Sequence, residues 1–349
     1  MDNEWFERRT YRSSEWTVEQ LVELKRRRGS TVSLVIPARD EAATVGGIVA
    51  RVRTALQEEA PLLDEIVVMD SDSTDDTGAR ARAAGAAVHR VGDVRPELGH
   101  HRGKGEAMWK SLFVTSGDII AFMDADLVEW DTHFVSGLLG PLLTEPGVSL
   151  VKGFYDRVLD RSGTAGEPRG AGRGPGTGGP DGPGDTDGSG EAASHGGGRV
   201  TELVARPTIA LRWPQLSGVV QPLSGEWAIR RGLFERLSVP TGYGVELAVL
   251  VDTALRYGVD AVAQVDLGRR AHRHQSLRGL GAMATELLAV ADRRAGIDHG
   301  ADSVRIRQFG AGERRGRPLD STVSIVERPP AAEVGAGDAE VLEGVVGRC

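Results

Sequence analysis

The chain has 349 residues and a formal net charge of −8, with 40% hydrophobic and 26% charged residues. These values are ordinary for a globular protein of one large or two modest domains, and the acidic balance argues against a nucleic-acid or anionic-membrane partner. A single cysteine, Cys349, excludes an intrachain disulfide, and no apolar run approaches the roughly 18 residues of a membrane span, so we expect a cytoplasmic protein without an integral membrane segment.

Residues 1–30 are predicted to form a helical extension. Val18, Leu21 and Val22 recur at helical spacing, and Gly29 follows a basic run at residues 25–28. Cations suit the carboxyl end of a helix and glycine suits its last position, so we interpret the run as a solvated helix end rather than a binding patch.

Residues 31–161 alternate between predicted strands and helices. Apolar or β-branched runs at 31–37, 65–69, 87–91 and 119–126 predict strands, and helical patterns follow at about 45–56, 77–84 and from 104. Residues 147–155 predict a further strand. This alternation is typical of a mostly parallel, doubly wound α/β sheet.

Two carboxylates, Asp124 and Asp126, close the most apolar of these runs. Side chains two residues apart on a strand point the same way, and ligands of open α/β sheets bind beyond the carboxyl ends of the strands. Hard carboxylate oxygens there suit Mg²⁺ or Mn²⁺. A solvated turn is the alternative.

Other polar residues follow neighbouring strands. Asp70 and Ser71 lie at a strand end, where they could hold a ribose or a base, whereas residues 73–75 are interpreted as caps of the next helix. Lys104 precedes a helix and has glycine on both sides, which predicts a phosphate partner and close approach of the backbone to a ligand. The spacing is not that of a P-loop.

Residues 162–198 are mostly glycine, proline and small polar residues, with no large apolar side chain. Such a segment buries too little surface to offset its conformational entropy, so a flexible insertion is predicted, either inert or a cover near the site.

Residues 199–300 are predicted to form an acceptor-binding half. Gly198, Arg199 and Thr201 at a helix start would suit an acidic ligand, with an ordinary capped helix as the alternative. A helix from 243 to 255 carries Glu246, and a strand at 261–268 leads into a basic segment at 269–275. That segment is either a surface loop or a source of a metal-binding histidine and of cations for anionic oxygens. The tail, residues 301–349, is assigned no chemistry.

Four motifs in this order resemble those of GT-A nucleotide-sugar glycosyltransferases: residues 35–41, 70–75, 103–107 and 124–126. Four further motifs resemble the family of glucosyl-3-phosphoglycerate synthases: residues 197–207, 221–226, 242–246 and 270–273. That family implies a retaining transfer of glucose from UDP-glucose to D-3-phosphoglycerate, a divalent cation, a homodimer and, in actinobacteria, an early step of methylglucose lipopolysaccharide synthesis. Asp72 stands where the family commonly has glycine.

The resemblance also assigns roles at the matching positions. Donor and nucleotide binding is implied for Pro37, Ala38, Arg39, Glu41, Asp70, Ser71, Lys104, Asp124 and Ala125. Asp126 and His272 would bind the metal. Acceptor binding is implied for Gly198, Arg199, Val200, Thr201, Tyr243, Arg270, Arg273 and His274. Catalytic positions facing the sugar and the attacking hydroxyl would be Asp124, Glu246 and the backbone at Leu223.

Several alternatives stay open at this point. The same fold could use GDP-mannose, as a mannosyl-3-phosphoglycerate synthase does, or another acceptor. An inverting glycosyltransferase would need a general base, for which Glu246 is the obvious candidate. A catalytically silent nucleotide-sugar-binding protein and a nucleotidyltransferase are the remaining candidates.

Overall fold

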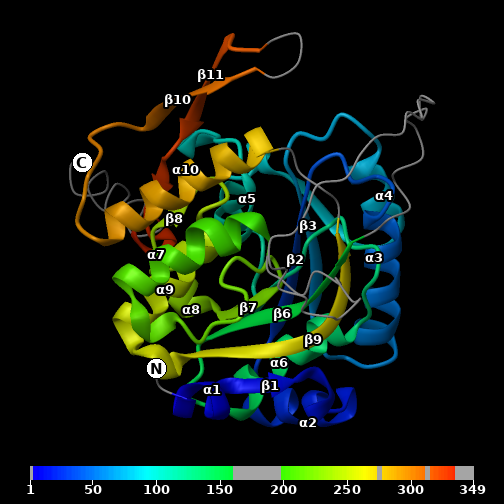
Figure 1. Ribbon diagram of the computed structural model, residues 1–349. Helices are drawn as coiled ribbons and strands as arrows, with labels where there is room; N and C mark the ends of the chain where they lie inside the picture. The colour runs from blue at the N-terminus through cyan, green and yellow to red at the C-terminus, as the bar shows by residue number, and fades with distance from the viewer. Residues whose placement is uncertain (1–2, 160–197, 273–276, 311–314, 335–349) are drawn as a thin grey trace, which may run out of the picture.

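The computed structural model describes residues 3–159, 198–272, 277–310 and 315–334. Most of the predicted insertion at 162–198 therefore lies outside the described residues, as do Arg273 and His274. Figure 1 shows a twisted central sheet with helices on both faces and a hairpin that projects beyond them. The prediction of a mostly parallel α/β fold is confirmed.

The central sheet has eight strands in the order β1-β9-β6-β7-β5-β2-β3-β4. Only β7 runs antiparallel to its neighbours, β5 and β6. The bounds are β1 (Thr10–Arg12), β2 (Val32–Ala38), β3 (Glu65–Asp70), β4 (Ala87–Arg90), β5 (Ile119–Phe122), β6 (Leu150–Leu159), β7 (Trp227–Arg230) and β9 (Val262–His272).

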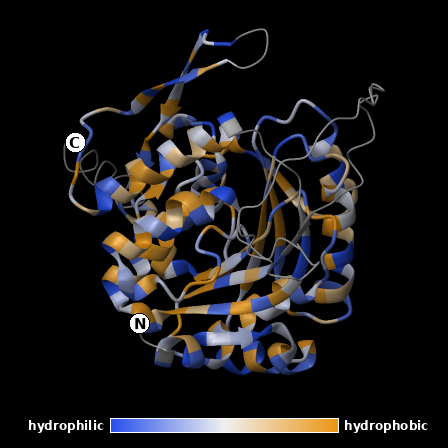
Figure 2. Cartoon of the chain, in the orientation of Figure 1, coloured by the Kyte–Doolittle hydropathy of each residue, from blue (hydrophilic) through white to orange (hydrophobic). Residues whose placement is uncertain are grey.

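The central strands are apolar on both sides, and each side packs on its own set of helices. In β2, Leu34 and Ile36 face one core and Val35 faces the other. The first core is covered by α2 (Val18–Arg28), α3 (Val45–Arg53), α4 (Thr77–Ala83) and α6 (His133–Thr144). The second is covered by α1 (Asn3–Arg9), α5 (Lys104–Ser111), α7 (Arg206–Arg212), α8 (Arg231–Phe234), α9 (Val245–Tyr257) and α10 (Leu277–Arg294). Figure 2 shows the apolar strands between these layers.

The amino-terminal extension is helical, as predicted, but it also adds the edge strand β1. Gly29 ends α2 with a left-handed φ of 61°, and Arg26, Arg27 and Arg28 are exposed, which confirms the solvated helix end. Lys25 is instead buried and forms an ion pair with Asp64 at 2.8 Å.

The carboxyl-terminal part contains more structure than its sequence indicates. Of the two alternatives for the basic segment at 269–275, the surface loop is wrong for residues 269–272, because β9 continues through His272 and pairs with β6. Strands β10 (Ser303–Phe309) and β11 (Pro318–Ser324) form the projecting hairpin, and β12 (Glu327–Arg328) pairs with β8 (Val239–Pro240). Within the described ranges, no helix has the length and apolar character needed to cross a membrane.

Candidate active site

A cavity of about 580 Å³ lies at the carboxyl ends of β2 and β5. Its lining brings together most of the residues that the sequence singled out. Those from the donor-binding motifs are Pro37, Ala38, Arg39, Glu41, Ser71, Lys104, Asp124, Ala125 and Asp126. Those from the second half are Gly198, Arg199, Val200, Thr201, Leu223, Tyr243, Glu246 and Arg270.

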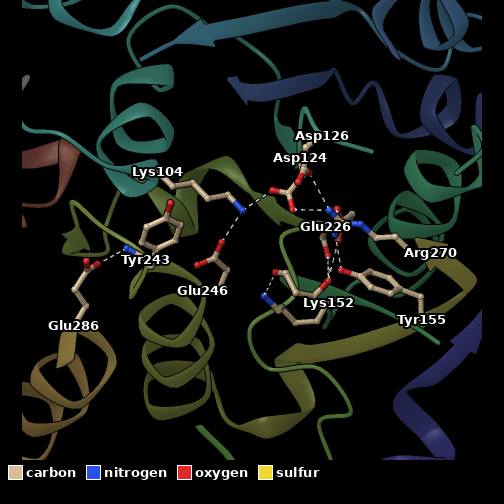
Figure 3. A network of polar contacts seen from close by, with 11 residues as sticks. Lys104, Asp124, Asp126, Lys152, Tyr155, Glu226, Tyr243, Glu246, Arg270 and Glu286 are labelled. Carbon is tan, nitrogen blue, oxygen red and sulfur yellow. Dashed lines mark hydrogen bonds and ion pairs between the residues drawn. The ribbon is translucent and has the colours of Figure 1, made fainter. Parts of the chain in front are cut away.

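Lys104 forms the centre of the charged network in this cavity (Figure 3). It sits in the first turn of α5, and its Nζ atom lies 2.6 Å from Asp124 Oδ1 and 2.8 Å from Glu246 Oε1. Burial alone would lower the pKa of Lys104, but the two carboxylates outweigh it and raise the pKa. The side chain is therefore a permanent cation that bridges a donor-motif residue and a residue of α9.

Arg270 joins the two aspartates to a buried glutamate. Its Nη2 atom lies 3.2 Å from Asp124 Oδ2 and 3.0 Å from Asp126 Oδ1, and its Nη1 atom lies 2.9 Å from Glu226 Oε1. It also donates a hydrogen bond to the Tyr155 hydroxyl at 2.6 Å. Burial would raise the pKa of Asp124, yet Lys104 and Arg270 together hold it well below its usual range.

Two buried residues in this network were not predicted to be part of the site. Glu226 is completely buried, and burial raises its pKa despite the contact with Arg270. Lys152 in β6 donates to the Ser224 carbonyl at 2.9 Å, and burial lowers its pKa to about 7. The sequence signals that could have identified them are a lysine directly after the apolar start of β6 and a glutamate at the end of the motif at residues 221–226, just before β7.

Glu286 of α10 reaches the site from the far side of the cavity. Its Oε2 atom accepts a hydrogen bond from the Tyr243 amide at 2.5 Å, and burial raises the pKa of both side chains. No sequence pattern at Glu286 indicated this role, because the contact depends on how α10 packs against α9.

Asp70 lies outside the cavity lining, in contrast to Ser71. It is buried, and its Oδ1 atom accepts a hydrogen bond from the Ser73 amide at 2.9 Å, so it holds the turn after β3. Asp72 has a left-handed φ of 59°, a conformation that suits the glycine expected there from the resemblance. Its carboxylate lies 3.0 Å from His100 Nε2 and outside the cavity lining.

The glycines beside Lys104 have a packing role, and Gly103 also lines the cavity, so the predicted approach to a ligand stays a prediction. A Cβ atom at Gly103 or Gly105 would collide with the backbone of residues 240–242. The Gly105 amide donates to the Gly242 carbonyl at 3.3 Å, and the Glu106 amide donates to the Thr241 carbonyl at 2.9 Å. The two glycines therefore allow the start of α5 to pack closely on the segment that leads into α9.

The donor atoms at Asp124 and Asp126 fit a divalent cation. Both are hard carboxylates that line the cavity, and Mg²⁺ and Mn²⁺ commonly take one or two of these together with phosphate oxygens. Among the residues described, no three His, Cys, Asp or Glu side chains cluster closely enough to bind a metal by themselves. The backbone of His272 ends β9, and its side chain is outside the described part of the structure, so its predicted metal role stays a prediction.

The sheet is mostly parallel, two aspartates follow one of its central strands, and a lysine faces them. This is the architecture of a GT-A-fold glycosyltransferase. In agreement, residues 33–173 match the model of the family described as glycosyl transferase family 2. Over 330 residues the chain is 43% identical to the glucosyl-3-phosphoglycerate synthase of Mycolicibacterium smegmatis, covering 95% of this chain and 98% of that protein. The chain therefore belongs to the glucosyl-3-phosphoglycerate synthase family.

Solved structures show the same relationship. A crystal structure of Mycobacterium tuberculosis glucosyl-3-phosphoglycerate synthase, in complex with Mn²⁺, UDP-glucose and phosphoglyceric acid, is 41% identical with a TM-score of 0.74 and covers 91% of this chain and 95% of its own. The mannosyl-3-phosphoglycerate synthase of Rubrobacter xylanophilus is 36% identical with a TM-score of 0.79 and covers 95% of this chain and 97% of its own.

Proposed function

We propose that the protein transfers glucose from UDP-glucose to the hydroxyl group of D-3-phosphoglycerate and retains the anomeric configuration. The observation that carries this proposal is the single cavity lined by both sets of motifs, with Lys104 linking Asp124 to Glu246 between them. Residues 31–161 supply the donor side and residues 199–300 the acceptor side. The amino-terminal extension adds the edge strand β1, and the carboxyl-terminal part adds the β10–β11 hairpin and β12.

The donor side is suited to a nucleoside diphosphate. Pro37, Ala38, Arg39, Glu41 and Ser71 would contact the nucleotide, and Lys104 would neutralise charge on the departing diphosphate. Asp126 and His272, with Asp124 and Ala125 nearby, would hold Mg²⁺ or Mn²⁺. When bound, the cation supplies charge stabilisation to the phosphate oxygens.

The acceptor side is suited to a small dianionic molecule. Arg199 follows Gly198 at a helix start, beside Val200 and Thr201, so a guanidinium, backbone amides and a hydroxyl come from residues that line the cavity together. Tyr243, Arg270, Arg273 and His274 would complete this side. Holding phosphate and carboxylate there would direct the acceptor hydroxyl toward the sugar, with Glu246 and the Leu223 backbone beside it.

The decisive assay offers D-3-phosphoglycerate with UDP-glucose or GDP-mannose in parallel, with Mg²⁺, with Mn²⁺ and with EDTA. We expect glucosyl-3-phosphoglycerate from UDP-glucose, in the α configuration by NMR, and loss of product with EDTA. Product from GDP-mannose alone would favour the mannosyl alternative, which the Rubrobacter xylanophilus structure keeps in consideration. Absence of product from either donor would refute both.

We also propose that the protein is a cytoplasmic homodimer. In an organism that makes methylglucose lipopolysaccharide, it would act early in the synthesis of that polymer. The resemblance of the motifs to the family supports this, and no surface feature of the described residues carries it independently. Light scattering after size-exclusion chromatography would test the dimer, since a monomeric mass at micromolar concentration contradicts it.

A further inference from the structure

The segment at residues 326–329 lies far from the cavity in sequence, yet it contacts α5 directly and is linked to α9 through α10, and these two helices carry the central ion pair. Lys104 belongs to α5 and Glu246 to α9. Arg328 in the tail contacts α5, and Glu327 beside it contacts α10, which in turn contacts α9.

Arg328 holds the first turn of α5 through Glu106. Its Nε atom lies 2.7 Å from Glu106 Oε2 and its Nη2 atom lies 2.6 Å from Glu106 Oε1, a bidentate pair in which the arginine side chain is 9% exposed and the glutamate 0%. The guanidinium also donates to the carbonyl of Leu98 at 2.7 Å and lies over the Trp109 ring at 5.0 Å. All its observed partners are therefore on α5 or on the loop before it.

The backbone of the tail holds the segment before α9. Arg328 pairs with Val239 in the two-stranded β8–β12 sheet, and the Thr241 amide donates to the Val326 carbonyl at 3.0 Å. The Thr241 carbonyl in turn accepts a hydrogen bond from the Glu106 amide. The tail, the turn before α9 and the start of α5 thus form one hydrogen-bonded unit.

Glu327 extends the connection to α9 itself. Arg294 of α10 lies 2.8 Å from Glu327 Oε1 and 2.8 Å from Asp252 Oδ2 of α9, and its side chain is 6% exposed. The segment is therefore bound to α5 by Arg328 and linked to α9 indirectly, because Arg294 of α10 bridges Glu327 and Asp252.

The start of α5 needs such support because glycine stands on both sides of Lys104. Gly103 has a φ of 140°, a conformation that other residues rarely adopt, and glycine restricts the backbone least of all residues. A shift of the first turn by a fraction of an ångström would move the Lys104 ammonium relative to Asp124 and to a bound diphosphate.

We propose that Arg328 is a positioning residue for this enzyme. Through Glu106 it holds the first turn of α5, and so it places the Lys104 ammonium against Asp124 and against the diphosphate of the donor. This inference rests on the proposed function for the identity of the donor, but its test uses UDP binding and does not depend on transfer.

The test is a double-mutant cycle on UDP affinity, measured by calorimetry with Mn²⁺ present. We compare Arg328→Met with the native protein, and the same substitution in a Lys104→Met background. If Arg328 acts by placing Lys104, the dissociation constant should rise at least about tenfold in the native background and less than about twofold in the Lys104→Met background. Equal effects in both backgrounds would overturn the proposal.

Arg230→Met is the matched control for a general loss of stability. Its guanidinium also bonds buried carbonyls, those of Val148 and Leu142, but Arg230 pairs with Ile119 at the amino end of β5, opposite the cavity. The UDP affinity of Arg230→Met should stay within about twofold of the native value. It is measured at a temperature at which circular dichroism shows that Arg230→Met and Arg328→Met are both folded. An equal loss in both variants would make Arg328 merely structural.

Arg328→Lys keeps the proposal testable if Arg328→Met does not fold. Lysine retains the charge but cannot make the bidentate pair with Glu106, so we expect a smaller weakening of UDP binding in the same direction. Native affinity in a folded Arg328→Lys protein would contradict the proposal. Failure of the native protein to transfer glucose would refute the proposed function and leave this cycle interpretable.

Discussion

Replacing Arg270 with methionine tests whether the buried network is held together by charge. Methionine keeps an unbranched stem but lacks the charged guanidinium, so the substitution leaves the Glu226 carboxylate, which is 0% exposed, without the cation that pairs with it at 2.9 Å. Breaking a buried pair by removing one partner typically costs about 3–5 kcal/mol, because the remaining charge is buried and uncompensated. We expect the free energy of unfolding to fall by about that amount.

The companion variants separate this charge effect from lost packing. The double variant Arg270→Met, Glu226→Leu also removes the buried carboxylate, while Asp124 keeps Lys104 and Asp126 is partly exposed, so it should be more stable than Arg270→Met alone by roughly 2 kcal/mol or more. Urea unfolding of the native protein, both single variants and the double variant provides the four free energies. The reasoning is refuted if Arg270→Met costs less than about 1 kcal/mol, or if the two single losses simply add.

Three further substitutions probe other parts of the cavity. Burial lowers the pKa of Lys152 from 10.5 to about 7. Between these two pH values the unfolded chain binds more protons than the folded protein, so the free energy of unfolding should rise with pH. We expect a gain of about 3 kcal/mol between about pH 7 and pH 9.5 in urea unfolding, and its absence in Lys152→Met. Gly225→Ala would place a Cβ atom against the Asp124 carboxylate, so kcat should fall at least about tenfold. In the control Gly232→Ala the added Cβ atom meets no such close contact, so kcat should stay near the native value. Arg199→Ala should raise the KM for 3-phosphoglycerate far more than the KM for UDP-glucose in steady-state kinetics, and equal rises would place Arg199 elsewhere.

The sequence by itself determined the strands of the donor half and the groups at their ends. Apolar runs such as Ile119–Phe122 are buried whichever partner they meet, and the polar residues that follow them fall at one edge of a parallel sheet. The positions of Asp124 and Asp126 at the cavity follow from this local information.

Only the tertiary structure decided the surroundings of those groups. Residues 269–272 have the composition of a surface loop, but they pair with residues 156–159 of β6, and this pairing places Arg270 against Glu226. Arg328 meets Glu106 across 222 positions of sequence, and Gly103 packs on a backbone segment far along the chain. Each contact depends on how distant elements pack against one another, and no local pattern of residue types encodes that packing.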